Sequence, residues 1–257
     1  MYLMIATRPD IAYPVTKLAQ FGSCPTPRHW KGILRVLCYL RKHDSVRLCL
    51  GNPTPVLNIF PSSPANAFPQ SALVEFFDAS LMDCVQSRKS TGAYVFFLQG
   101  SCISWASKKQ HLIALSSTEA EFIAGTDAAK ELTWIAHFLA DLGPLGAQWT
   151  TTVPVLCGDN QGALAMAKSN TFRPRTKHIH VRERFIAQMV QDGHCQIFYV
   201  PTRDMIADAL TKALPRERLK TLLAHMGLQF HGNIPQSCQT CLRCFTTRNE
   251  LYCNGGP

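Results

Sequence analysis

Long apolar runs are missing from this sequence: no window holds the roughly 18 uninterrupted apolar residues that a membrane-spanning helix needs. The N-terminal stretch MYLMIATRPDIAYPV carries Arg8, Pro9 and Asp10 where a signal peptide would need an apolar core. We therefore expect an intracellular protein. Acidic residues are scarce, since 17 Asp and Glu stand against 26 Lys and Arg for a formal charge of +9. That balance suits a polyanionic partner such as nucleic acid.

Closely spaced cysteines are absent from most of the chain. Seven of the eleven cysteines stand singly among apolar residues, as expected of buried free thiols in a reducing compartment. These are Cys24, Cys38, Cys49, Cys84, Cys102, Cys157 and Cys195. The other four, Cys238, Cys241, Cys244 and Cys253, match neither the paired knuckles of a zinc ribbon nor a complete ferredoxin motif. We predict an unstructured tail over 229–257, with a zinc site or an iron–sulfur cluster as the alternatives.

The first part of the chain is basic and helical by pattern. Residues 1–50 predict two helices broken at 23–27, and the second, over 29–43, places an apolar stripe on one side. That stripe consists of Trp30, Ile33, Leu34, Leu37 and Leu40. Five prolines within 51–71 exclude a regular helix there and predict a linker, so a domain boundary is expected near residue 70.

Residues 72–228 have the pattern of an α/β domain. Three strand-like runs, 72–78, 91–98 and 101–107, predict an antiparallel meander, with Gln99 and Gly100 as the tight turn between the last two. A long amphipathic helix over 115–142 follows. Further strands are expected at 153–159 and 194–200, and further helices at 160–168, 176–191 and 203–226. This order predicts a mixed sheet of five strands covered by helices.

A carboxylate interrupts the apolar face of the long helix. Glu121 lies seven residues before Ala128, on the stripe formed by Ala128, Leu132, Ile135, Leu139 and Leu142. An ionised carboxylate on such a face is costly unless it is paired, protonated or bound to a metal. The alternative is a helix-capping role with Thr118. Glu119 faces away from the stripe, and its spacing from Ser116 predicts only a capping box.

Three more acids occupy comparable positions. Asp78 and Asp159 each end a predicted strand, where side chains line the crevice of a helix-covered sheet, and Asp208 is expected in the middle of an apolar helix. Each alone can be a turn, cap or surface residue. If these three and Glu121 converge, they require cations between them. Oxygen ligands suit Mg²⁺ or Mn²⁺, and two such ions about 4 Å apart form the arrangement that cuts phosphodiesters, one activating water and the other steadying the leaving oxygen.

Several long strings resemble one family. RKSTGAYVFF (88–97), ISWASKKQ (103–110), ALSSTEAEFIA (114–124), CGDNQGALAMAK (157–168), RTKHIH (175–180) and YVPTRDMIADALTKALPRER (199–218) resemble the ribonuclease H domain of copia-type retrotransposon Pol polyproteins. Residues 2–50 resemble the connecting segment at the end of the reverse transcriptase that precedes this domain. The resemblance covers roughly residues 2–228 in unbroken order, which makes it highly specific.

The resemblance implies a fold and an activity. It places the catalytic, metal-binding acids on Asp78, Glu121, Asp159 and Asp208. It implies the ribonuclease H-like mixed five-stranded sheet, preceded by a small helical segment. The implied reaction is endonucleolytic hydrolysis of the RNA strand of RNA–DNA hybrids with two Mg²⁺ or Mn²⁺ ions, leaving 3′-hydroxyl and 5′-phosphate ends. The remainder of the Pol polyprotein is an expected partner, and a cytoplasmic virus-like particle or the nucleus is the expected location.

The sequence departs from the family pattern at three places. Ser80 and Leu81 stand where the family has Asp-Trp, and His180 stands where it has Asp. The mobile His that many cellular ribonucleases H carry before the last acid is absent, as in other copia-type sequences. The metal-binding aspartates of the polymerase are expected before residue 1, so DNA synthesis by this chain is not expected.

A basic surface is predicted to bind the substrate. Basic residues around 168–184 and at the end of the third strand can bind the phosphates of a nucleic-acid backbone. The alternative is that these residues only form a solvated helix face and loop. The candidate binding residues are Lys108, Lys109, Asn160, Gln161, Arg173, Arg175, Lys177 and His178. Trp105 and Trp134 are predicted to be core residues rather than base-stacking platforms.

Three functional hypotheses follow. The first is a ribonuclease H. The second is a catalytically silent nucleic-acid-binding remnant of a Pol protein. A strand-transferring integrase of the same fold is a third, which is disfavoured because such enzymes use three acids and lack the RTKHI and ADALTK strings.

Overall fold

The computed structural model of the protein describes residues 1–50, 73–149, 152–168 and 185–230. Within these ranges the N-terminal part holds α1 (Tyr2–Ala6), η1 (Pro9–Ile11), α2 (Ala12–Ala19), α3 (Pro27–Lys42) and β1 (Arg47–Leu48). The sheet and its helices follow as β2 (Leu73–Ser80), β3 (Thr91–Leu98), β4 (Ser101–Lys109), α4 (Ser117–Asp141), α5 (Pro144–Ala147), β5 (Val155–Gly158), α6 (Gln161–Lys168) and β6 (Gln196–Tyr199). The described chain ends with η3 (Thr202–Asp204), α8 (Asp208–Thr211), α9 (Arg216–His225) and β7 (Leu228–Gln229). Residues 185–191 are also helical.

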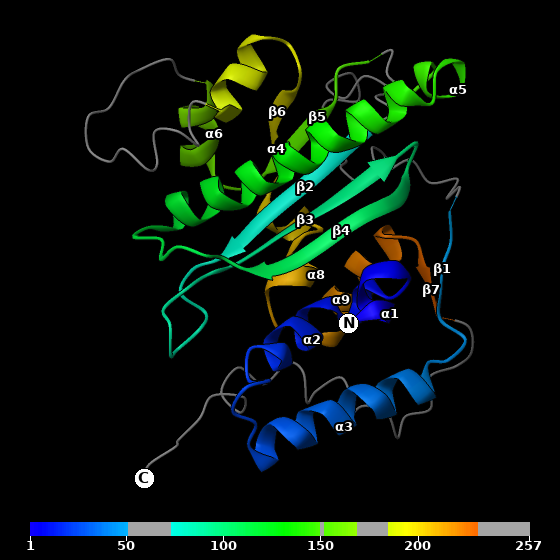
Figure 1. Cartoon of the computed structure of the whole chain (residues 1–257), viewed down its shortest axis with the longest axis vertical. Helices are drawn as coiled ribbons and strands as arrows, with labels where there is room; N and C mark the ends of the chain where they lie inside the picture. Colours follow the sequence, from blue (N-terminus) through cyan, green and yellow to red (C-terminus); the bar gives the residue numbers. More distant parts are fainter. Residues whose placement is uncertain (51–72, 150–151, 169–184, 231–257) are drawn as a thin grey trace.

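The main sheet has the order β4-β3-β2-β5-β6. Strands β2, β3 and β4 form an antiparallel meander, whereas β5 runs parallel to β2 and β6 runs parallel to β5. Figure 1 shows α4 lying across one face of this sheet, with α8, α9 and the N-terminal helices on the other face. The predicted α/β fold, a mixed sheet of five strands with flanking helices, is confirmed.

The turn between β3 and β4 explains why the antiparallel meander could be predicted from the sequence. Gln99 and Gly100 both have positive φ, 50° and 75°, which is the backbone geometry of the tightest hairpin turns. The strand over 91–98 was predicted with the observed bounds, because turn residues follow a run rich in β-branched and aromatic residues, TGAYVFFL. The neighbouring strands extend two residues further than predicted, β2 to Ser80 and β4 to Lys109.

Two hydrophobic cores lie on the two faces of the sheet. On the face covered by α4, Phe77 and Phe96 pack with Leu132 and Ile135. On the opposite face, Phe76 and Val95 pack against the apolar residues of α8 and α9. Successive residues of β2 alternate between these cores, as the two-residue period of a strand requires.

The N-terminal helical segment belongs to the second core. Met4, Ile11 and Tyr39 are buried in the same cluster as Leu210 and Leu222. Polar contacts add to this packing: the indole of Trp105 donates a hydrogen bond to the carbonyl of Met4 (2.8 Å), and Thr16 donates to the carbonyl of Ser107 (2.9 Å). The segment also supplies β1, which pairs with β7 in a two-stranded sheet that was not predicted.

The apolar stripe expected on one side of α3 lies mostly at the surface: Trp30 (58% exposed), Ile33, Leu34 and Leu37 face outward, whereas Leu40 packs against the second core. The buried face is formed instead by His29, Gly32, Val36 and Tyr39. A Cβ on Gly32 would lie 2.8 Å from a methyl group of Leu18, so the missing side chain allows α3 to approach α2 closely. The hydroxyl of Tyr39 donates to Asp10 (2.7 Å), which makes its burial inexpensive.

Several smaller expectations are also corrected. Trp134 is 61% exposed and stacks on Phe138 with ring centroids 5.6 Å apart, rather than lying in the core, and Leu142 is exposed. Trp105 is partly buried against the core, as predicted. Cys84, Cys102, Cys157 and Cys195 are buried free thiols as predicted, but Cys49 is intermediate, and Cys24, before α3, and Cys38, on the outward side of α3, are exposed.

Some predictions concern residues outside the described ranges. These are the linker over 51–71, the start of the helix expected at 176–191, and residues 231–257 of the predicted tail. The first residue of that tail, Gln229, is not unstructured as predicted but belongs to β7. No helix among the described residues is long and apolar enough to cross a bilayer.

Candidate active site

The parallel pairing of β2 and β5 brings two acids together at one edge of the sheet. Phe76 pairs with Cys157, so continuing this register by two residues places Asp159 beside Asp78. Asp78 is almost fully buried on β2, and Asp159 directly follows the end of β5. The hydroxyl of Thr202 donates to Asp159 Oδ2 at 2.8 Å, which fixes the orientation of that carboxylate.

The third acid comes from the first turns of α4. Ser116 caps this helix by accepting a hydrogen bond from the backbone N–H of Glu119 (3.1 Å), and the Glu119 carboxylate accepts one from the N–H of Leu115 (2.8 Å). The predicted capping role of Glu119 is therefore confirmed. Glu121 lies on the buried side, where its Oε1 accepts a hydrogen bond from the N–H of Ala79 at 3.1 Å. This bond ties α4 to the residue that follows Asp78.

The three acids form a cluster suited to a metal ion. One carboxylate oxygen from each of Asp78, Glu121 and Asp159 lies within 4.8 Å of the other two. Glu121 Oε2 is buried and has no hydrogen-bond partner among the described residues. A buried carboxylate oxygen without a donor is costly, and an all-oxygen ligand set is what Mg²⁺ and Mn²⁺ prefer. The residues therefore fit a hard divalent ion.

Asp208, the fourth predicted ligand, reaches the cluster through a cation. The amine of Lys212 lies 3.0 Å from Asp78 Oδ1 and 2.6 Å from Asp208 Oδ1. Asp208 Oδ2 is paired with Arg218, and Asp78 Oδ2 accepts a hydrogen bond from Thr211. Asp208 is the first residue of the short helix α8, not the middle of a longer helix as predicted, because the chain turns between η3 and α8.

Crowding of charges shifts the titration of these groups. Burial raises the pKa of Glu121 well above its ordinary value, and the charges of Asp78 and Asp159 raise it further. Burial and Asp78 raise the pKa of Asp208 to about 6 despite its two basic partners. Burial alone would lower the pKa of Lys212, but Asp78 and Asp208 raise it. The site thus holds more negative charge than its own basic residues neutralise.

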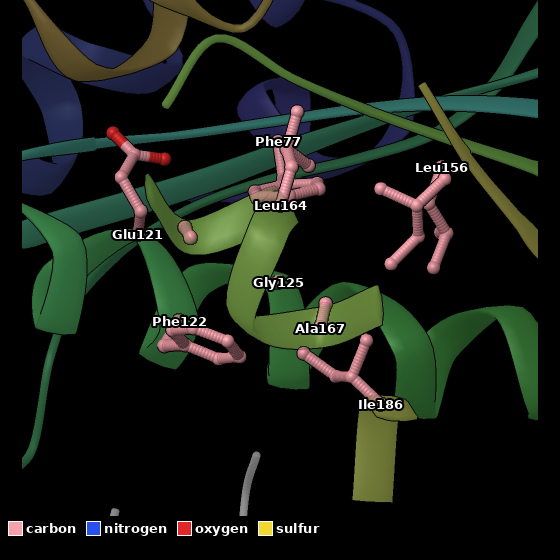
Figure 2. A pocket seen from close by; sticks show the side chains of 10 residues that line it. Phe77, Glu121, Phe122, Gly125, Leu156, Leu164, Ala167 and Ile186 are labelled. Carbon is pink, nitrogen blue, oxygen red and sulfur yellow. The ribbon is translucent and has the colours of Figure 1, made fainter. Parts of the chain in front are cut away.

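A small pocket with mostly apolar walls adjoins the acidic cluster at Glu121. Figure 2 shows Glu121 extending from α4 away from the apolar side chains of Phe122, Ala167 and Ile186, which line this pocket. Gly158, at the end of β5, packs closely against the ring of Phe77. A Cβ on Gly158 would lie 2.7 Å from that ring, so a larger residue would not fit without a shift. Tight packing under the acids holds their backbones in fixed positions.

The predicted nucleic-acid-binding residues are only partly within the described chain. Lys108 is exposed at the end of β4, with its amine 5.8 Å from the ring centroid of Tyr94, and Lys109 is half-buried beside it. Asn160 caps α6 by accepting a hydrogen bond from the N–H of Ala163 (2.9 Å), and Gln161 is exposed at the start of that helix. Arg173, Arg175, Lys177 and His178 lie outside the described residues.

Four contacting residues were missed in the sequence. Thr202, Thr211 and Arg218 each touch one of the four acids, and Lys212 touches two of them. For Lys212 a signal existed, because it stands four residues after Asp208, the spacing at which helical side chains meet. For Thr202 and Arg218 no local pattern pointed to the site, since their contacts depend on how η3 and α9 pack.

Comparison with known proteins gives relatives across most of the chain. No family model matches the sequence. The retrovirus-related Pol polyprotein of transposon TNT 1-94 from Nicotiana tabacum is 35% identical over 233 residues, 91% of this chain. That of transposon RE2 from Arabidopsis thaliana is 34% identical over 237 residues, 92% of this chain. The chain spans 16% and 15% of the length of these two relatives.

Among solved structures, the ribonuclease H1 of the halophilic archaeon Halobacterium salinarum is similar at 19% identity. The match covers 58% of this chain and 98% of that chain, with a TM-score of 0.36. An antiparallel meander followed by two parallel strands, with helices on both faces, makes the fold of this chain ribonuclease H-like.

Proposed function

Because this chain belongs to the family of copia-type retrotransposon Pol polyproteins, we propose that it is a metal-dependent ribonuclease H. Its substrate would be the RNA strand of an RNA–DNA hybrid, cut internally during reverse transcription. The observation that carries the proposal is the cluster of Asp78, Glu121 and Asp159 at the edge of a ribonuclease H-like sheet, with their oxygens within 4.8 Å of one another.

The roles of the acids follow from their surroundings. Asp78 belongs to the triad with Glu121 and Asp159 and is also connected to Asp208 through Lys212, so these four acids would together hold the ions. Bound there, two Mg²⁺ or Mn²⁺ ions supply Lewis-acid chemistry to the attacking water and the leaving oxygen. The chain's own contribution is to hold its oxygens in place: the N–H of Ala79 orients Glu121, and the hydroxyl of Thr202 orients Asp159.

Substrate binding would use the basic residues near this edge. Thr91 pairs with both Ser80 and Lys109, so the end of β4 reaches the same edge of the sheet as the acids. This location supports the proposal that Lys108 and Lys109 would contact a phosphate backbone lying across the cluster. Contacts to 2′-hydroxyl groups would distinguish the RNA strand from the DNA strand.

The proposal is tested with the purified full chain and an end-labelled RNA–DNA hybrid. We expect cleavage of the RNA strand with Mg²⁺ or Mn²⁺, none with EDTA, and at least about a 100-fold loss in Asp159→Asn. Asp141→Asn, at the opposite end of α4 and exposed, is the matched control and should cleave normally. Binding of the hybrid without cleavage, unchanged in Asp159→Asn, would contradict the proposal and favour a catalytically silent remnant.

A further inference from the structure

Lys212 occupies the space between two buried carboxylates of the site. The side chains of Asp78 and Asp208 are each 1% exposed. The Lys212 amine contacts the Oδ1 atom of both, at 3.0 and 2.6 Å. The two Oδ2 atoms have different partners, Thr211 for Asp78 and Arg218 for Asp208. Only the Oδ1 atoms would therefore be released if the amine moved away.

We propose that Lys212 is a tethered cation that takes the place of a divalent ion between Asp78 and Asp208 and is displaced when that ion binds. The inference rests on the metal-binding part of the proposed function. A monovalent ammonium and a divalent ion cannot share one pair of oxygens, because their charges repel at that distance. The ion must therefore compete with the amine for this position.

The side chain is suited to leaving. A lysine amine is a compact, strongly hydrated charge on a flexible stem, and the Lys212 side chain is already one third exposed. Arg218 is a different case, because its guanidinium also donates to the backbone carbonyl of Thr202 at 2.7 Å, whereas the partners given for the Lys212 amine are the two carboxylates. Lys212 can swing into water while Arg218 and Thr211 keep the two carboxylates in place.

The consequence is an order of binding. The triad of Asp78, Glu121 and Asp159 includes an oxygen without a partner, Glu121 Oε2, and can accept an ion first. The position between Asp78 and Asp208 requires displacement of the amine and should therefore bind more weakly. Lys212 would also keep the two acids from repelling each other while the metal is absent.

The test measures Mn²⁺ binding to the full chain without nucleic acid, by calorimetry and by the electron paramagnetic resonance signal of free Mn²⁺. We expect the weaker binding step to tighten about 10- to 100-fold in Lys212→Gln, since the competing charged hydrogen bonds are lost. In EDTA the same variant should have a lower Tm. Lys220→Gln, on the neighbouring helix α9, should bind as the wild type does.

A second measurement needs no variant. The rate at which an amine-reactive acetylating reagent modifies each lysine is read by mass spectrometry in EDTA and in Mn²⁺. Lys212 should become several-fold more reactive in Mn²⁺, whereas Lys220 should not change. Equal reactivity of Lys212 in both conditions, or unchanged Mn²⁺ affinity in Lys212→Gln, overturns the inference while leaving metal binding intact. Absence of any Mn²⁺ binding by wild type and variant alike overturns the metal-dependent function as well.

Discussion

A carboxylate in the hydrophobic core offers a sharp test of the structure. Glu75 lies on β2 among the residues beside α4, is 0% exposed, and neither of its oxygens has a hydrogen-bond partner among the described residues. It pairs in register with Phe96 on one side and Leu156 on the other. Burial raises the pKa of Glu75 well above its ordinary value, because a low-dielectric environment favours the neutral form of a carboxyl group.

We expect Glu75→Met to stabilise the protein at neutral pH. An unsatisfied buried polar group costs about 1–3 kcal/mol, and methionine has a similar length without that cost. The effect should depend on pH. Between the lower pKa of the unfolded chain and the raised pKa of the folded one, the folded state binds one more proton, so stability falls by about 1.4 kcal/mol per pH unit as pH rises. The variant should lack this contribution.

The assay is urea unfolding at pH 5, 6, 7 and 8, comparing each variant with wild type. The gain from Glu75→Met should be larger at pH 8 than at pH 5. Glu75→Gln should remove the same pH dependence but give less stability, because an amide in this position is still unsatisfied. Glu217→Met, at an exposed position of α9, is the control and should stay within about 0.5 kcal/mol. A destabilised Glu75→Met, or a gain equal at all four pH values, would refute the reasoning.

Three further predictions concern the site and its support. Thr202→Val removes the hydroxyl that orients Asp159 and should weaken Mn²⁺ binding about tenfold in calorimetry, with unchanged affinity as the contrary result. Lys108→Gln and Lys109→Gln should each lower the slope of log hybrid affinity against log salt by about 1, whereas Lys42→Gln on α3 should not. Tyr39→Phe, which loses the bond to Asp10, should cost about 1–2 kcal/mol in urea unfolding, while Tyr2→Phe at an exposed position should be neutral.

The strands and the long helix could be predicted because local pattern and tertiary packing agree there. The run 91–98 is followed by turn residues, and the residues of the predicted stripe on α4 are buried with the exception of Leu142. In α3 the local pattern and the tertiary packing disagree. Periodicity identifies an apolar face but not which side of a helix packs inward, and His29 becomes buried because its ring accepts a hydrogen bond from the N–H of Thr26 (3.0 Å) and stacks on Phe21.

In the candidate site, too, some residues could be predicted from local pattern and others depend on tertiary packing. Asp78 and Asp159 were found from their places near strand ends, and Glu121 from its place on an apolar stripe, since those positions have geometric consequences that a sequence records. The bridge made by Lys212 depends on a side chain folding back toward two acids 134 and 4 residues away. No pattern near Lys212 encodes the longer of these contacts. Glu75 was missed because a single acid within a strand of apolar residues does not by itself reveal whether it faces water.

The shared interior of the N-terminal helices and the sheet limits how the molecule can be dissected. Met4, Ile11 and Tyr39 fill one wall of a core whose other walls are β2, β3 and the C-terminal helices. Lys17 donates a hydrogen bond to Thr91 at the edge of the sheet that holds the candidate site (3.1 Å). A fragment that starts after the proline-rich stretch would leave that wall open to solvent. Such a fragment should aggregate or misfold, so a shortened or chimeric protein needs to keep residues 1–50 together with the ribonuclease H-like sheet.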